Sequence, residues 1–143
     1  MKDAAAAVVD ACVAVKWVVE EAGSDTARSL SPTRLEAPDL LLIECANILW
    51  KKVRLGDLSP RDAAVRLDVL MVAPVKLTAG GELLKSALEL ALELQHPVYD
   101  CMYVALALRR DIPLVTADER LAAAVRKRRK LAARVLLLSE LQG

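Results

Sequence analysis

The 143-residue sequence has no phenylalanine, a single histidine (His96) and three cysteines without a Cys-x-x-Cys pair. One histidine is too few for a multi-histidine zinc site, and three cysteines do not form a disulfide framework. The five glycines form neither a P-loop nor a dinucleotide-binding fingerprint. No apolar run has the length of a membrane span. These absences exclude several enzyme classes and a membrane protein, and the cysteine usage favours a reducing compartment, so we expect a cytoplasmic location.

Positive and negative charges nearly balance over the whole chain, which has a net charge of +1. This total gives no indication of a nucleic-acid, membrane or acidic partner. The distribution is uneven, because residues 1–118 carry 13 Lys and Arg against 17 Asp and Glu, whereas residues 119–143 carry 7 against 2. A hydrophobic content of 55% with 27% charged residues is typical of a globular chain of this length. We therefore expect a single domain over residues 1–143.

Short apolar segments alternate with longer segments of helical periodicity. The candidate strands are residues 8–9, 35–37, 74–77, 112–116 and 135–138. Helical spacing or capping signals occur over residues 12–21, 27–30, 39–54, 59–71, 80–94 and 98–110, and again from residue 119. Parallel strands joined through helical crossovers need helices on both faces of the sheet. The sequence therefore predicts an α/β fold, a three-layer α/β/α sandwich with a short central parallel sheet.

Four carboxylates stand in apolar surroundings. Asp10 and Asp118 follow candidate strands, and in open parallel sheets ligands bind at the carboxyl ends of strands. Glu44 lies within a predicted helix whose segment 40–50 contains one other polar residue, Asn47, on the same side. Asp100 lies in the first turn of the predicted helix over residues 98–110. A buried ionised carboxylate is costly unless it is paired or binds a cation.

Each of these acids also has a structural explanation. Asp10 and Asp118 suit helix N-caps, and Asp100 suits the positive end of a helix dipole. Glu44 has no capping role, so its best structural partner is Lys51 or Lys52. If the four converge, their repulsion raises their pKa values unless divalent cations neutralise them. Oxygen donors without His or thiolate select Mg²⁺ or Mn²⁺, as in two-metal phosphodiester hydrolysis, where the ions activate a water and stabilise the leaving oxygen.

Four segments resemble, in order, the sequence blocks of PIN-domain nucleases, specifically the VapC-type toxins. The segments are residues 8–17, 41–51, 99–107 and 114–121. The resemblance implies that Asp10, Glu44, Asp100 and Asp118 form an acidic, catalytic metal-binding set. It also implies an endoribonuclease that uses Mg²⁺ or Mn²⁺ and cuts RNA such as tRNA or rRNA. Its expected partners are a cognate VapB-type antitoxin and a second copy in a homodimer.

The resemblance also indicates supporting residues around the acids. Thr116 occupies the family's hydroxyl position before the fourth acid, where it can orient a carboxylate or a water. Cys12 stands where the family usually has Ser or Thr, and a thiol is a weaker hydrogen-bond partner. Asn47 and Lys51 share the helix face of Glu44, either as substrate contacts or as a polar helix margin. Cys12, Cys45 and Cys101 each lie near a proposed ligand, and we interpret them as small buried hydrophobes rather than a thiol site.

Cations near the acidic blocks are candidate contacts to RNA phosphates. A run of five stands at a predicted helix C-terminus, where the alternative interpretation is a solvated helix end. The candidate RNA-binding residues are Lys16, Lys51, Arg120, Arg126, Lys127, Arg128, Arg129 and Lys130. The main alternative to a nuclease is a catalytically silent PIN-like module that binds RNA or a protein.

Overall fold

Five parallel strands form the centre of the computed structural model, which describes residues 5–30 and 33–141. The strand order is β3-β2-β1-β4-β5, so the first strand in the chain is the middle strand of the sheet. The strands are β1 (Ala6–Val9), β2 (Arg34–Pro38), β3 (Val75–Thr78), β4 (Leu114–Thr116) and β5 (Val135–Leu137). In the register, Val8 lies between Glu36 of β2 and Leu114 of β4. The predicted parallel α/β sheet is confirmed, and all carboxyl ends meet at one edge.

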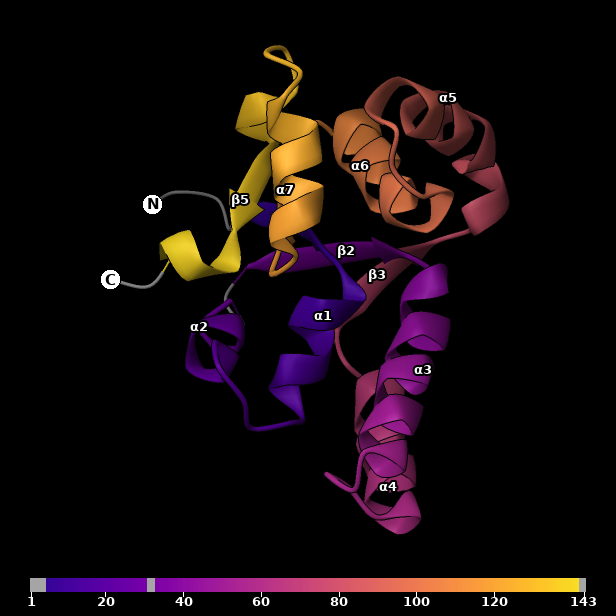
Figure 1. Ribbon diagram of the computed structural model, residues 1–143, viewed down its shortest axis with the longest axis vertical. Coiled ribbons are helices and arrows are strands. Elements are labelled where there is room, and N and C mark those ends of the chain that lie inside the picture. Colours follow the sequence, from indigo (N-terminus) through magenta and orange to yellow (C-terminus); the bar gives the residue numbers. More distant parts are fainter. Residues whose placement is uncertain (1–4, 31–32, 142–143) are drawn as a thin grey trace.

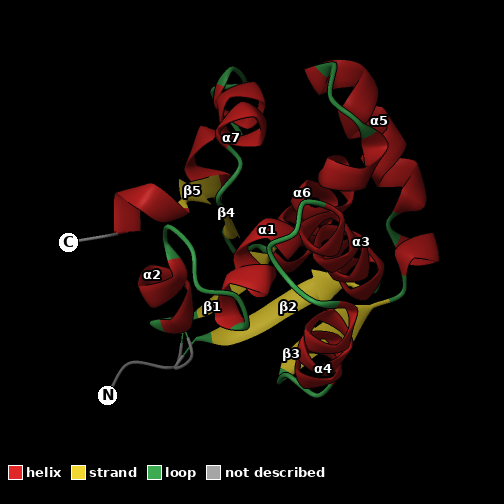
Figure 2. Cartoon of the chain, turned by 60° about the horizontal axis from the view of Figure 1, so that its bottom comes forward, coloured by secondary structure: helices red, strands yellow, loops and turns green. Residues whose placement is uncertain are grey.

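Helices cover both faces of this sheet (Figures 1 and 2). On one face, helix α6 (Val98–Arg110) packs over β1, β2 and β4, with α5 (Leu84–Leu94) outside it and α7 (Glu119–Arg126) beside it over β4 and β5. The other face is covered by α1 (Ala11–Ala14), the 3₁₀ turn η1 (Val15–Trp17), α2 (Ser24–Arg28) and the 3₁₀ turn η4 (Leu138–Leu141). A further turn, η3 (Ala132–Arg134), leads into β5. This is the three-layer arrangement that the alternating pattern predicts.

Helices α3 (Leu40–Arg54) and α4 (Pro60–Met71) form a hairpin that packs on α1 beyond the carboxyl edge of the sheet (Figure 1). Gly56, at φ +85°, occupies the left-handed region and ends α3, as its position predicts. Ser59 caps α4 by accepting a hydrogen bond from the backbone N–H of Asp62 at 3.0 Å. The hairpin thereby brings one face of α3 to the end of β1.

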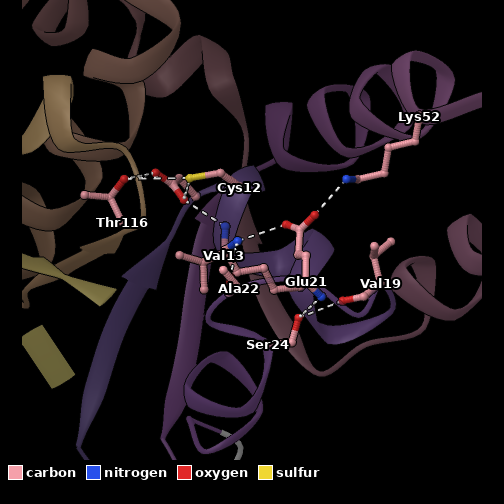
Figure 3. Close-up of polar contacts among 10 residues, drawn as sticks. Cys12, Val13, Val19, Glu21, Ala22, Ser24, Lys52 and Thr116 are labelled. Carbon is pink, nitrogen blue, oxygen red and sulfur yellow. Dashed lines mark hydrogen bonds and ion pairs between the residues drawn. The ribbon is translucent and has the colours of Figure 1, made fainter. Parts of the chain in front are cut away.

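The predicted helix over residues 12–21 is wrong beyond Trp17. The chain leaves the helix there because side chains hold the following loop in another conformation. The Ser24 hydroxyl donates to the Val19 carbonyl at 2.8 Å and accepts the Glu21 N–H at 2.9 Å, and Lys16 donates to the Ala22 carbonyl at 2.8 Å (Figure 3). Such local side-chain bonds compete with helix formation.

The predicted start of the helix over residues 80–94 is also wrong. Residues Gly80–Glu82 form a 3₁₀ turn, η2, and α5 begins at Leu84. Asp39 stands at the N-cap position of α3, but its side chain makes no capping bond there and instead accepts the Gly80 N–H at 3.1 Å. This bond joins the end of β2 to the turn after β3. In the part of the chain that the structure describes, no helix is both long and apolar enough for a membrane span.

Candidate functional site

A cleft of about 690 Å³ opens at the carboxyl edge of the sheet. The end of β1, the N-terminal turns of α1, α3, α6 and α7, and one face of α3 surround it. All four predicted acids line it. The lining residues are Asp10, Ala11, Cys12, Leu40, Ile43, Glu44, Asn47, Ile48, Lys51, Tyr99, Asp100, Ala117 and Asp118. Residues that are up to 108 positions apart in the sequence therefore face one space.

Asp10 is the most enclosed of the four acids, with 6% of the residue exposed. It caps α1 by accepting the backbone N–H of Val13 at 3.2 Å. The Cys12 thiol donates to the same carboxylate at 2.9 Å, and the Thr116 hydroxyl donates to its other oxygen. Burial raises the pKa of Asp10 to about 6, although these three donors lower it, and the charge of Asp100 raises it further. Asp10 therefore caps α1 and also lies close enough to Asp100 for the two charges to interact.

Thr116 joins the two strand ends that carry acids. Its hydroxyl donates to Asp10 and accepts the backbone N–H of Asp118 at 2.9 Å. The Cys12 sulfur lies 3.9 Å from the same hydroxyl, and Figure 3 shows the two side chains approaching each other from opposite sides of the carboxylate between them. Thr116 is fully buried, so water does not compete for these bonds.

Among residues 5–30 and 33–141, Glu44 has no lysine partner, contrary to the alternative that the sequence left open. Lys52 pairs with Glu21 at 2.7 Å, and Oε1 of Glu44 accepts the Tyr103 hydroxyl at 2.5 Å. Burial raises the pKa of Glu44, the Tyr103 hydrogen bond lowers it, and the charge of Asp100 raises it. Asp100 therefore lies close enough to influence both Glu44 and Asp10, which is a property of a shared anionic site.

In Asp100 and in Asp118, one of the two carboxylate oxygens is held by hydrogen bonds to the protein. Oδ2 of Asp100 lies 2.7 Å from Nε2 of His96. Oδ1 of Asp118 caps α7 by accepting the N–H groups of Arg120 and Leu121 at 2.9 and 3.2 Å. Within residues 5–30 and 33–141, the second oxygen of each has no protein hydrogen-bond partner, and the same is true of Oε2 of Glu44.

These oxygens suit a hard divalent cation. Among the described residues, no three Asp, Glu, His or Cys side chains are close enough together to hold an ion as a ready-made cage. Mg²⁺ commonly binds through one or two carboxylates and retains several waters, so it does not need such a cage. The donor chemistry therefore fits Mg²⁺ or Mn²⁺ with partial protein ligation. Burial raises the pKa values of Asp10 and Glu44, so a bound cation would stabilise the charged forms of both side chains.

The candidate RNA-binding cations are scattered rather than gathered. Lys51 lines the cleft together with Asn47, whereas Lys16 pairs with Glu21 at 2.9 Å outside it. Arg120 is exposed on the first turn of α7 and lies outside the lining. Residues 126–130 follow the opposite end of α7 from Asp118, and none of them lines the cleft.

Two members of that run are paired with acids. Arg126 forms a bidentate ion pair with Glu140, with N–O distances of 2.6 and 2.9 Å. Nε of Arg128 lies 3.6 Å from the carboxylate of Glu93. No such pair involves Lys127, Arg129 or Lys130 in the described part of the chain, and all three are exposed. The run is therefore a local cationic surface of three free side chains at the far end of α7.

The three cysteines remain isolated thiols. Burial raises the pKa of Cys45 to about 12 and that of Cys101 to about 11, and it raises the pKa of Cys12 as well. A thiol held neutral in this way is a poor ligand for a soft metal. The interpretation of these residues as small hydrophobes fits this environment, with Cys12 as an additional donor to Asp10.

Sequence reasoning missed the partners of two acids. Tyr103 lies within the predicted helix over residues 98–110 and His96 lies just before it, and neither was assigned to the site. The available signal was spacing, because Tyr103 follows Asp100 by three positions and His96 precedes it by four, both helical distances. The exposed side chains of Ile43 and Tyr99 at the cleft were also missed.

Comparison with known proteins agrees with this geometry. The PIN domain family matches residues 7–127. Ribonuclease VapC3 of Pyrobaculum aerophilum is 39% identical over 119 residues, which are 80% of this chain and 91% of that protein. Ribonuclease VapC1 of Mycobacterium tuberculosis is 38% identical over 90 residues, which are 62% of this chain and 65% of that protein.

Two solved structures share the fold. PAE2754 from Pyrobaculum aerophilum superposes with a TM-score of 0.73 at 24% identity and covers 97% of this chain and 95% of its own. VapC20 of Mycobacterium tuberculosis, described as a sarcin-ricin loop cleaving toxin, gives a TM-score of 0.62 at 17% identity over 82% of this chain and 94% of its own. With the four acidic blocks in order around one cleft, the matched family and the VapC relatives lead to one assignment: the chain belongs to the PIN domain family, as a VapC-type member.

Proposed function

We propose that this chain is an endoribonuclease that depends on Mg²⁺ or Mn²⁺ and acts as the toxin of a type II toxin-antitoxin pair. The observation that carries the proposal is the cleft at the sheet edge, which all four carboxylates line. The relatives named Ribonuclease VapC support the reaction class. The oxygen-only donor set supports a hard divalent cation.

A bound divalent cation would supply Lewis-acid activation of a water and neutralisation of charge at the scissile phosphate. The chain's own residues supply the oxygen ligands and the hydrogen bonds that orient them. Asp10, Glu44, Asp100 and Asp118 offer carboxylate oxygens, and Thr116 and Cys12 hold Asp10 in a fixed orientation. Lys51 and Asn47 line the same cleft, where an ammonium and an amide suit an RNA phosphate or base. The free carboxylates repel a polyanion, so RNA binding at this cleft requires the cation.

The proposal includes three partners. The substrate is RNA, with tRNA or rRNA as the class, and a VapB-type antitoxin holds the enzyme inactive. A second copy of the chain forms a homodimer. Leu84, Leu88 and Leu92 support a protein contact, because they are exposed at four-residue spacing on one side of α5. The three free cysteines support the cytoplasmic location that belongs to this proposal.

The test is cleavage of total tRNA and rRNA by the purified chain with Mn²⁺, with Mg²⁺ and with EDTA. Asp10→Asn and Asp100→Asn remove one charge each from the cleft and should abolish cleavage. The matched control is Asp68→Asn, which removes an exposed carboxylate on α4 outside the cleft and should cleave normally. Cleavage that survives EDTA or either cleft substitution contradicts the proposal. Metal binding without cleavage of any RNA would indicate the silent module instead.

A further inference from the structure

The histidine at the turn before α6 contacts one of the four acids directly. Nε2 of His96 lies 2.7 Å from Oδ2 of Asp100, and only 12% of the histidine side chain is exposed. Asp100 follows His96 by four positions, so the contact joins the residue before the N-cap of α6 to the first turn of that helix. A carboxylate accepts hydrogen bonds, and therefore Nε2 of the ring is the donor.

The backbone of His96 is fixed on both sides. Its N–H donates to the carbonyl of Ala91 at 3.2 Å, which closes the end of α5. Its carbonyl accepts the thiol of Cys101 at 3.8 Å, and Pro97 follows with φ −55°. Gln95 in front of it adopts the left-handed region at φ +53°. The ring therefore has a set direction and lies against α6 rather than in a free loop.

Asp100, like Glu44, has a single hydrogen-bond donor in the described part of the chain. Asp10 has three donors and Asp118 has two backbone N–H donors, whereas His96 is the one hydrogen-bond donor to Asp100 among the described residues. The N-cap of α6 is Pro97, which offers no side-chain cap. Without the imidazole, no hydrogen bond in the described structure holds the carboxylate of Asp100.

We propose that His96 is a positioning residue, whose Nε2–H holds Oδ2 of Asp100 and leaves Oδ1 directed to a divalent cation. The inference rests on the proposed function and adds a residue to its site. Hydrogen-bond partners of metal ligands fix ligand orientation, and their removal typically lowers metal affinity by about 10-fold to 100-fold. The role lies in cation binding, because the imidazole acts through Asp100 and is absent from the cleft lining.

The variants His96→Gln and His96→Asn provide a matched pair. Both carry the same amide, but the longer Gln side chain reaches the position of Nε2, whereas Asn reaches only the position of Nδ1. We expect Mn²⁺ affinity, measured by calorimetry on the intact chain, to fall at least 10-fold in His96→Asn and less than 3-fold in His96→Gln. These thresholds follow the order of magnitude for outer partners of metal ligands. In cleavage assays, excess Mn²⁺ should restore the rate of His96→Asn.

A second measurement uses the wild-type protein alone. Because His96 is the only histidine, its ring nitrogens give unambiguous ¹⁵N resonances. We expect Nε2 to carry a proton and its resonance to move when Mg²⁺ is added. An Nε2 without a proton overturns the inference, as does equal Mn²⁺ affinity in the wild type and His96→Asn, or equal loss in both variants. A wild-type protein that neither binds Mn²⁺ nor cleaves RNA instead contradicts the proposed function.

Discussion

The Tyr103 hydroxyl donates to Oε1 of Glu44 over 2.5 Å and so connects α6 to α3 at a residue that lines the cleft. Tyr103 is fully buried, and burial beside Glu44 raises the pKa of its phenol, so it remains a donor at all physiological pH values. The bond stabilises the charged form of Glu44 against the effects of burial and of Asp100. It therefore favours the carboxylate over the carboxylic acid at the cleft.

Tyr103→Phe should move the acidic limb of the pH–activity profile to higher pH. Removal of the hydroxyl takes away the interaction that lowers the pKa of Glu44, while burial and Asp100 continue to raise it. Glu44 then binds a proton at a higher pH, and cation binding requires its charged form. The measurement is the cleavage rate against pH at constant Mn²⁺, with Asp68→Asn as the control. A limb that stays in place or moves to lower pH contradicts the assignment.

Asp10 should make the metal-free protein less stable as the pH rises from about 4 to about 6. Its pKa is about 6 when folded and 3.8 as a model value, so the folded state binds the proton more tightly. Stability therefore falls with rising pH through this window, by an order of about 3 kcal/mol for this group. Asp10→Asn should lack this component.

Denaturant unfolding in EDTA at several pH values measures this effect. The difference in free energy of unfolding between the wild type and Asp10→Asn isolates Asp10 from the other carboxylates. The difference should grow between pH 4 and pH 6 and then remain constant. A constant difference across the whole range would mean that Asp10 has the same pKa in the folded and unfolded states, which contradicts the prediction.

Arg110→Met should destabilise the fold several times more than Arg109→Met. Arg110 pairs with Glu36 of β2, whose side chain is only 4% exposed, at 3.1 to 3.4 Å, and its loss leaves an uncompensated charge within the sheet. The neighbouring Arg109 pairs with Glu82 on the surface. We expect a loss of about 2–4 kcal/mol for Arg110→Met and less than about 1 kcal/mol for Arg109→Met. Equal losses in urea unfolding would contradict the burial argument.

Charge reversal at Lys127, Arg129 and Lys130 should weaken RNA binding without lowering the rate at saturating RNA. These three cations are free of acidic partners in the described structure and lie outside the cleft. If each contacts one phosphate of a single strand, the triple variant lowers the slope of log affinity against log salt by about 2. Fluorescence anisotropy across salt concentrations measures the slope. An unchanged slope would identify the run as a solvated helix end.

The sequence predicted the parallel sheet, and it singled out four acids that line one cleft, because both inferences depend on local patterns. Buried parallel strands such as Val8-Val9 and Leu114-Val115 are short apolar runs. Asp10 follows the first run directly, and Asp118 lies three positions after Val115. The partners of the acids depend on tertiary packing, which spacing within one segment does not specify. The bond from Thr116 to Asp10 spans 106 positions, and that from Tyr103 to Glu44 spans 59.

The failed helix over residues 12–21 shows a second limit. Its apolar spacing is helical, but Ser24 and Lys16 use the loop carbonyls as hydrogen-bond acceptors and end the helix early. Propensity within the segment gives no measure of these competing bonds. The cationic run shows a third limit, because proximity in the sequence to Asp118 suggested proximity to the cleft. An eight-residue helix, α7, separates the two.

The strand order also fixes when the cleft appears during biosynthesis. Strand β1 is made first, but its neighbour β4 begins at Leu114, and Asp118 follows that strand. A ribosome that has exposed the chain only as far as α6 has released three of the acids but neither the second flank of β1 nor Thr116. The nascent chain therefore lacks the fourth carboxylate and the bonds that orient the first. The cleft has all of its lining residues only once Asp118 has emerged, so a translation product that ends before Asp118 lacks part of the site.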